Sequence, residues 1–370
     1  MVTQTESRTL RRKDGSTIMF SVDEFVDRIC GTDCCFICGE ARGNVKFNDE
    51  HIIPRWVLKR YGLFDRNITL PNGKQHKYGT YKMPCCKECN SLLGKLIEDP
   101  MREMLAGGFD AVNIQLRDPK NGPLRIKALY AWLCLLFIKT HLKDRMLREH
   151  LNYNKGKAKI ADQYIWEMQH HIHCVARMPY VRGDIGPEVI GTLLWYRIKD
   201  EMMVDQFDYF DLTNDQTVVL RLGDVGLIAV LTDAGAAKHA LKNIIMETAG
   251  QTLTMVQLRE LAARLALASR QLINKPNFFT AVDRRDNQEN VRICAERAAT
   301  ANFEAIDYDQ LGEIMLFSLE GFIDNLDIGV AVDREEKRER IRRGDCSFIF
   351  DENMKFMNRT FLKPVKSAPA

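Results

Sequence analysis

Four of the eleven cysteines form two Cys-x-x-Cys pairs within the first 89 residues of the 370-residue chain. Four thiolates are the ligand set of a closed, tetrahedral structural zinc site. The two-residue spacing lets both sulfurs of one tight turn face a single ion, and Gly39 supplies a residue that adopts a left-handed conformation at low cost. We therefore predict that one zinc ion is bound by Cys35, Cys38, Cys86 and Cys89.

Two further cysteines, Cys34 and Cys85, lie directly beside these pairs and leave the register of the ligands ambiguous. Cys35 and Cys86 are favoured because each then gives the two-residue spacing. Reduced structural cysteines, or a single redox-active pair, are the alternatives to zinc. A disulfide framework fits poorly, because the chain is long and its number of cysteines is odd.

Between the two cysteine pairs lies the segment Asn48-Asp-Glu-His-Ile-Ile-Pro-Arg-Trp56. Glu50 and His51 are adjacent, so they cannot both point the same way along a strand. They can still share a site at the end of a strand, where one binds a metal and the other acts as a base. Pro54 suits the first turn of a helix over 55–61. Glu50 and His51 are thus expected where a strand gives way to a helix.

Taken together, these motifs resemble the HNH endonuclease family in its zinc-stapled treble-clef form. The resemblance rests on Cys35-x-x-Cys38, Glu50-His51-Ile-Ile-Pro54 and Cys86-x-x-Cys89-Asn90, in the family's order. It covers residues 30–100, about a fifth of the chain, and implies a ββα-metal module.

The resemblance also implies a mechanism and its residues. His51 matches the general base that activates a water molecule, and an ordinary histidine is partly neutral near pH 7. Glu50 and Asn90 match the residues that hold one catalytic divalent ion, Mg²⁺ or Mn²⁺. Such an ion neutralises charge on the scissile phosphate. The expected products carry 5′-phosphate and 3′-hydroxyl ends. These roles require Glu50, His51 and Asn90 to meet around one ion-sized gap.

The sequence departs from the family pattern at the middle asparagine, which normally braces the catalytic loop. The matching position, nine residues before Asn90, is Tyr81. Either the hydroxyl group of Tyr81 braces the loop, or Asn72 substitutes from the intervening segment.

The charge distribution favours nucleic acid as the substrate. Residues 41–97 contain eleven Lys or Arg and four Asp or Glu, a local balance of +7 in a chain of net charge +3. Concentrated positive charge beside a hydrolytic site is expected of a protein that binds the phosphate backbone. Arg55, Lys59 and Lys87 flank the motif and are the predicted phosphate contacts. No base-reading motif is visible, so we expect little sequence specificity from this module.

Composition and apolar runs limit the class of protein. Apolar residues make up 45% and charged residues 28%, an ordinary globular mixture. The longest apolar run, 128–138, is too short to span a bilayer, which takes ~20 residues. The first sixteen residues lack the apolar segment of a signal peptide. We expect a cytoplasmic protein without a membrane anchor.

The elements that must position these residues are expected in an α+β arrangement. Residues 1–29 are a polar lead-in, 30–100 the zinc module, 101–360 a mixed domain of helices and antiparallel strands, and 361–370 a tail. A Thr254-x-x-Gln257 capping box marks one helix start. Expected helices are 101–109, 124–151, 157–173, 234–243, 254–273 and 307–326. Expected strands are 189–198, 202–212, 217–222, 225–231 and 346–350.

Two functions from different classes follow from this sequence. The first is a metal-dependent endonuclease that cuts DNA, with RNA as a second substrate to test, and with a biological role in restriction or anti-phage defence suggested by the architecture. The second is a non-catalytic treble-clef zinc module that binds nucleic acid or a protein partner. The large region after residue 100 would then serve target selection, dimerisation or control by a regulatory protein.

Overall fold

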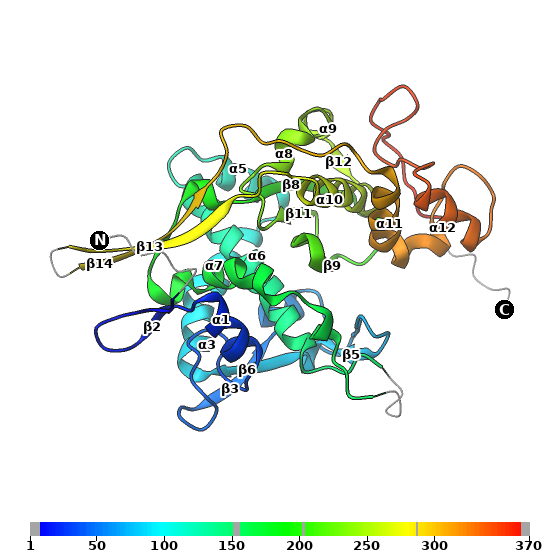
Figure 1. Ribbon diagram of the computed structural model, residues 1–370. Coiled ribbons are helices and arrows are strands. Elements are labelled where there is room, and N and C mark those ends of the chain that lie inside the picture. Colours follow the sequence, from blue (N-terminus) through cyan, green and yellow to red (C-terminus); the bar gives the residue numbers. More distant parts are fainter. Residues whose placement is uncertain (1–7, 151–155, 202–203, 286–287, 364–370) are drawn as a thin grey trace. The chain divides into compact units, whose positions relative to one another are not determined.

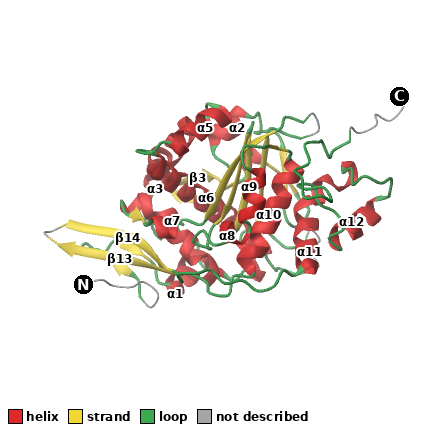
Figure 2. Ribbon diagram, turned by 90° about the horizontal axis from the view of Figure 1, so that it is seen from above, coloured by secondary structure: helices red, strands yellow, loops and turns green. Residues whose placement is uncertain are grey.

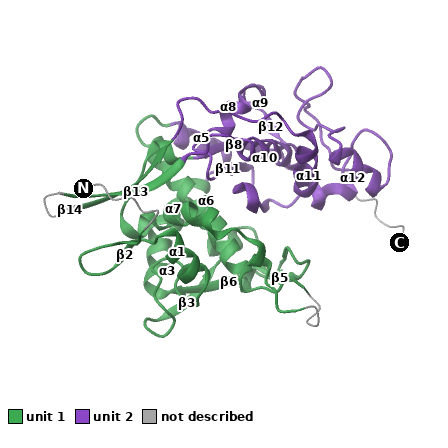
Figure 3. Ribbon diagram, viewed as in Figure 1, with its two compact units in different colours: residues 1–106, 118–190, 277–296 green, residues 107–117, 191–276, 297–370 purple. Residues whose placement is uncertain are grey.

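The structure is a computed structural model that describes residues 8–150, 156–201, 204–285 and 288–363. It is an α+β fold, as the sequence predicted, and 43% of it is helical. The chain forms two compact units, shown in different colours in Figure 3. Unit 1 comprises residues 1–106, 118–190 and 277–296, and unit 2 comprises 107–117, 191–276 and 297–370. The segment predicted to be a separate zinc module therefore shares unit 1 with residues far along the chain.

Unit 1 begins with a small hairpin and a helical turn that precede the first cysteine pair (Figure 1). Ser21 caps the turn, because its hydroxyl oxygen accepts a hydrogen bond from the Glu24 amide at 3.2 Å. Phe20 and Phe25 from this segment are completely buried. The first elements are β1 (Leu10–Arg11), β2 (Thr17–Met19), α1 (Val22–Glu24) and the π-helical turn Phe25–Cys30.

The central feature of unit 1 is an antiparallel hairpin followed directly by a helix. β3 (Phe47–His51) pairs with β6 (Lys82–Cys86), with Phe47 opposite Cys86 and His51 opposite Lys82. Helix α3 (Lys87–Leu93) starts at the residue after β6. This is the ββα order that the sequence predicted. The connection between the strands holds α2 (Arg55–Arg60), β4 (Asn67–Thr69) and β5 (Gln75–Lys77).

Apolar helices form the interior of unit 1. The middle of α6 (Gly122–Asp144) is buried throughout 129–138, and α6 packs against α7 (His170–Val181). Helix α4 (Asp99–Leu105) follows the π-helical turn Gly94–Glu98 that extends α3. A three-stranded sheet in the order β13-β14-β7 completes the unit, and Figure 2 shows β13 and β14 as a long hairpin. Its strands are β7 (Asp184–Ile185), β13 (Asn277–Arg285) and β14 (Gln288–Glu296).

Unit 2 is built on a five-stranded sheet in the order β12-β8-β11-β10-β9. Apolar side chains of β8, β10 and β11 pack against α10, whose capping box at Thr254 and Gln257 is present as predicted. The strands are β8 (Thr192–Ile198), β9 (Phe207–Leu212), β10 (Thr217–Leu222), β11 (Val225–Val230) and β12 (Thr252–Leu253). The helices are α5 (Gly108–Arg117), α8 (Ala237–Ala240), α9 (Lys242–Thr248), α10 (Met255–Arg270), α11 (Tyr308–Leu319) and α12 (Arg334–Arg342).

The structure corrects two expected elements, adds a hairpin that was not expected, and leaves one expected strand partly outside the described residues. The predicted helix over 157–173 is wrong in its first part, because the α-helix starts only at His170 and short 3-10 turns precede it. The long hairpin of β13 and β14 was not expected at all. The predicted strand 346–350 is an isolated bridge between Phe350 and Phe356. Residues 202–203 of the predicted strand 202–212 lie outside the described residues.

Candidate metal centre and catalytic motif

The two cysteine pairs come together as one cluster in unit 1. The sulfur atoms of Cys35, Cys38, Cys86 and Cys89 all lie within 4.8 Å of one another. The Cys38 and Cys86 sulfurs are 3.8 Å apart. A tetrahedron of sulfurs around zinc, at ~2.3 Å each, has edges of ~3.8 Å. The four thiols therefore fit a structural zinc ion, as the sequence predicted.

The structure also decides which neighbouring cysteines belong to the metal group. Cys86 caps α3, because its sulfur accepts a hydrogen bond from the Cys89 amide at 3.3 Å. Cys85 lies opposite Asn48 in the hairpin, and its buried sulfur is 3.8 Å from that of Cys35. The Cys34 thiol lies 3.4 Å from the Arg28 carbonyl oxygen. Neither Cys34 nor Cys85 joins the group of four.

Ionisation of this cluster requires a cation. The sulfur of Cys35, together with burial, raises the pKa of the Cys86 and Cys89 thiols well above its ordinary value. Four adjacent thiolates in a buried position are therefore stable only when a metal ion compensates their charge. The cluster can therefore hold a zinc ion, which would compensate the charge of its thiolates.

The first cysteine turn is braced by its own backbone and by Phe20. The Cys35 amide donates to the Glu40 carbonyl at 2.8 Å, and the Gly39 amide donates to the Cys35 carbonyl at 2.8 Å. Gly39 has φ of +77°, which favours glycine. A Cβ atom at Gly39 would lie 2.7 Å from the Phe20 ring. The turn thus needs glycine for its backbone and for its packing.

Helix α7 supplies two buried polar side chains that the sequence analysis did not assign to this site. His173 Nε2 lies 2.7 Å from the carbonyl oxygen of Phe36, within the first cysteine turn. Burial holds the pKa of His173 well below its ordinary value, so the ring is neutral and donates this hydrogen bond. Arg177, also fully buried, donates to the carbonyl oxygens of Thr17 and Ile18. The positive charge of Arg177 interacts with Cys38 and Cys89, and it would offset part of the negative charge of a zinc–thiolate centre.

His51 ends β3 at the predicted junction with α2. Its ring is half-buried and meets the Phe64 ring edge-on at 6.3 Å between centroids. Burial is the main cause that lowers the pKa of His51, and Lys82 lowers it further. Glu50 opposes this shift, and Arg55 and Lys139 add smaller lowering effects. The imidazole is therefore neutral at pH 7 and able to accept a proton.

Glu50 does not face an open gap. The carboxylate is buried, and its Oε1 atom accepts a hydrogen bond from Lys139 Nζ at 2.8 Å. The same ammonium group donates to the His51 carbonyl oxygen at 2.9 Å and to Glu98 Oε1 at 3.3 Å. Burial raises the pKa of Glu98 to about 7, with Lys139 opposing and the neighbouring Glu50 adding to the rise. Sequence reasoning missed Lys139 and Glu98.

Asn90 lies on α3 and is bound elsewhere. Its side-chain amide donates to Asn48 Oδ1 at 2.9 Å, with a longer contact of 3.5 Å to the Asp49 carbonyl oxygen. Within the described part of the chain, no hydrogen bond or ion pair joins Asn90 to Glu50. Both contacts use the amide nitrogen of Asn90, so the misfit of the predicted ligand set rests on Glu50. Glu50 already binds an ammonium ion, whose charge would repel a dication at the same carboxylate.

The two candidates for the bracing residue are also placed. The backbone carbonyl of Tyr81 accepts a hydrogen bond from the Ile52 amide at 3.0 Å, and its buried ring meets that of His76 at 5.6 Å. Tyr81 thus supports the residue after His51 through its main chain. Asn72 instead holds its own turn: it accepts from the Lys74 amide and donates to the Arg148 carbonyl oxygen.

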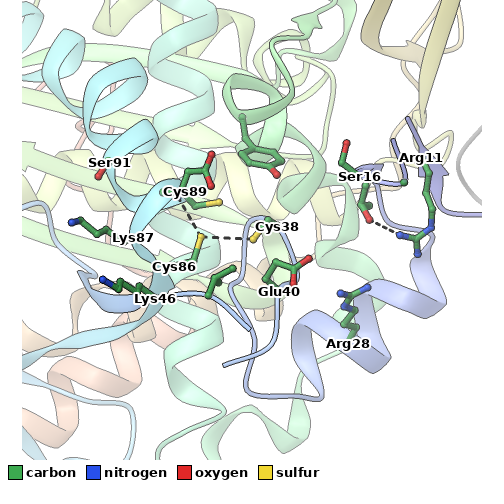
Figure 4. Close-up of a pocket in the computed structure, with 15 residues that line it drawn as sticks. Arg11, Ser16, Arg28, Cys38, Glu40, Lys46, Cys86, Lys87, Cys89 and Ser91 are labelled. Atoms are coloured by element: carbon green, nitrogen blue, oxygen red, sulfur yellow. Dashed lines mark hydrogen bonds between the residues drawn. The ribbon is translucent and has the colours of Figure 1, made fainter. Parts of the chain in front are cut away.

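The predicted phosphate contacts are exposed. Arg55 and Lys59 share one face of α2, since they are one turn apart, and both are solvent-accessible, as is Lys87. Beside the cysteine cluster lies a pocket of about 450 Å³ (Figure 4). Figure 4 shows Lys87 and Lys46 on one side of it and Arg28 and Arg11 on the other. Basic side chains therefore line two sides of the pocket beside the cysteine cluster, together with the acidic Glu40 and Glu88.

Comparisons with known proteins add no assignment. The chain matches no protein-family model, no curated protein and no solved structure. No helix among the described residues is sufficiently long and apolar to cross a membrane.

Proposed function

We propose that the ββα segment of unit 1 is the active site of an endonuclease that hydrolyses DNA phosphodiester bonds. One observation carries this proposal: His51 ends β3 with a lowered pKa, in a hairpin and helix stapled by a four-cysteine cluster. The resemblance to HNH endonucleases supports the same conclusion. The +7 balance of residues 41–97 supplies the attraction for a polyanion.

In this reaction the neutral imidazole of His51 takes a proton from water, and the resulting hydroxide attacks phosphorus. A new P–O bond forms, and the bond to the 3′ oxygen breaks. The leaving 3′ oxygen takes a proton from solvent, which leaves a 3′-hydroxyl and a 5′-phosphate. Tyr81 helps to fix the loop after His51 through its main chain.

The resemblance implies that Glu50 and Asn90 bind Mg²⁺ or Mn²⁺, which would act as a Lewis acid. The proposed reaction has no step through that ion, because Glu50 is already bound to Lys139. The zinc ion at Cys35, Cys38, Cys86 and Cys89 has a structural role, since four thiolates complete its coordination.

A second function has an observation in its favour. A zinc module that binds nucleic acid or a protein partner without cutting would have no use for an open carboxylate, and Glu50 is closed off by Lys139. In either function the role of unit 2 in target selection, dimerisation or regulation stays a prediction, as does a role in restriction or anti-phage defence.

The deciding experiment is a nicking assay on supercoiled plasmid DNA with Mg²⁺, Mn²⁺ or EDTA, with single-stranded RNA in parallel. We expect conversion of plasmid to nicked and linear forms, and its loss in His51→Ala with zinc content and thermal stability retained. His150→Ala, which removes an exposed histidine of unit 1, is the matched control. A folded His51→Ala protein with full activity would refute His51 as the base. Binding of DNA without cleavage in every condition would favour the second function.

A further inference from the structure

Lys139 is the most unusual side chain near the candidate site. It extends from α6, directly after the apolar stretch 129–138, and its side chain has no exposed surface. Its ammonium group has three acceptors: Glu50 Oε1, the His51 carbonyl oxygen and Glu98 Oε1. A lysine ammonium has three donors, so its hydrogen-bonding capacity is filled.

The charges explain why this lysine remains ionised while buried. Burial alone would lower the pKa of Lys139, but the two carboxylates outweigh it and raise the pKa above its ordinary value. A buried charge is tolerated only when it is paired and hydrogen-bonded, and here both conditions are met. Glu50 therefore has a permanent cation of its own, supplied by the chain.

The geometry also links Lys139 to His51. Because the ammonium binds the His51 carbonyl oxygen, it fixes the main chain where β3 ends and the imidazole projects. Because it binds Glu50 as well, it holds two successive residues of the motif. Lys139 cannot touch a substrate, since it is fully buried, so its effect must pass through these two residues.

We propose that Lys139 is a positioning residue of the candidate site, and that it is the cation bound by Glu50 in place of a divalent ion. Glu50 is then a structural anchor for the end of β3 rather than a metal ligand. The part of this proposal that concerns catalysis rests on the proposed function. The part that concerns the cation does not, and it can be tested without any cleavage.

The first test measures Mn²⁺ binding by the electron paramagnetic resonance signal of free Mn²⁺, with the zinc-loaded full chain. We expect Glu50→Gln to bind Mn²⁺ as the unaltered chain does. Lys139→Ala opens the space between Glu50 and Glu98, and two free carboxylates there should bind Mn²⁺ roughly tenfold more tightly or better. That gain should disappear in Lys139→Ala/Glu50→Gln. Lys139→Met removes the charge but fills the space, so it should show no gain.

Two results would overturn the assignment. One is weaker Mn²⁺ binding, by about tenfold, in Glu50→Gln with Lys139 intact, the size expected for loss of a metal ligand or its support. The other is the absence of any gain in folded Lys139→Ala. If Lys139→Ala does not fold, Glu50→Gln decides alone, because it keeps Lys139 and Glu98 paired and leaves no cavity.

The second test applies to DNA nicking. We expect Lys139→Met to lower kcat while KM is unchanged, and to shift the ring resonances of His51 in a histidine-labelled sample. Lys127→Met is the matched control, because Lys127 lies on the same helix and pairs with Asp184 at 2.6 Å. Equal effects of the two variants, or unchanged His51 resonances in Lys139→Met, would show a merely structural role. If the unaltered chain never cuts, the proposed function fails, and the Mn²⁺ test still decides which cation Glu50 binds.

Discussion

At the scale of single residues, His51 and Lys139 show how burial prepares the candidate site. His51 is poised as a neutral base because burial and nearby cations disfavour its protonated form. Lys139 is stable as a cation because two carboxylates surround it. The sequence predicted an ordinary histidine at this position, and it did not predict the burial that lowers the pKa of His51. Nor did it predict the second effect, because Lys139 in the sequence marks only the polar end of an apolar run, and its partners lie 89 and 41 residues away.

The lowered pKa of His51 gives a prediction for the pH dependence of cleavage. The base acts in its neutral form, which is lost as the pH falls through the pKa of the folded protein. Because that pKa lies below the ordinary value of ~6.5, the acid limb of the activity profile should be centred below pH ~6.5. The measurement is kcat/KM for plasmid nicking between pH 5 and pH 8, approximately. An acid limb centred above pH ~6.5 would contradict the placement of His51.

The buried hydrogen bond of His173 gives a prediction for the zinc centre. In His173→Phe the Phe36 carbonyl loses its donor, and an unsatisfied buried polar group costs about 1–3 kcal/mol. We expect a lower free energy of unfolding by this order, and faster release of zinc to a chelator. Urea unfolding and a colorimetric zinc assay would measure the two effects. His239→Phe, on α8 of unit 2, should change neither.

At the scale of elements, the zinc-binding turn and the ββα hairpin position the site together. The sequence sufficed to predict the four ligands, because Cys-x-x-Cys spacing is a local property, and also the strand end at His51 and the helix after Pro54. It did not suffice for Tyr81, which supports the loop through its backbone carbonyl, a group that every residue carries. Nor did it reveal that Glu50 and Asn90 take separate partners, because side-chain direction depends on packing from α6.

The first cysteine turn gives a prediction at this scale. Gly39→Ala would place a methyl group 2.7 Å from the Phe20 ring in a backbone with positive φ. Gly43→Ala is the matched control, since Gly43 also has positive φ but no atom within 4 Å of the added carbon. Both changes carry the backbone cost, about 1 kcal/mol. Only Gly39→Ala should also weaken zinc retention, which competition with a chelator measures. Equal zinc retention in Gly39→Ala and Gly43→Ala would show that the Phe20 contact has no such role.

Loss of a zinc ligand should have a much larger effect on the same elements. In Cys89→Ser the cluster loses a thiolate, and metal binding at such sites is largely folding free energy. We expect zinc loss and unfolding of the hairpin and α3, seen as increased hydrogen exchange in β3 and β6. Cys294→Ser, on β14, should keep its zinc. Normal protection of β3 in zinc-free Cys89→Ser would contradict the structural role of the metal.

At the scale of the whole molecule, charge is concentrated in one segment. The chain has a net charge of +3, while residues 41–97 carry +7, so the remainder is net acidic. When DNA binds, the exposed Arg55 and Lys59 on α2 should neutralise phosphates, and the DNA should release the counterions held there. In Arg55→Gln/Lys59→Gln we expect the slope of log K against log salt to become shallower by about 2 for duplex DNA. Fluorescence anisotropy at several salt concentrations measures this, and Lys242→Gln on α9 is the control.

An unchanged salt slope in Arg55→Gln/Lys59→Gln would show that α2 does not contact the phosphate backbone.

The domain boundaries, unlike the charge distribution, could not be predicted from the sequence. Residues 277–296 belong to unit 1 although 86 residues of unit 2 precede them, and nothing in a local pattern records that return. The strand pairing that returns the chain is non-local, like the reach of Lys139 to Glu50.

This return of the chain has a consequence for synthesis on the ribosome. β7 ends at Ile185, and its partner β14 begins only at Gln288. At ~5–20 residues per second, about 100 residues take ~5–20 s to translate. The zinc-binding segment, α6 and α7 therefore leave the ribosome well before the strand that completes their sheet. During this interval the nascent chain has its metal ligands and Lys139, but the exposed edge of β7 must wait for β14 while unit 2 is being made.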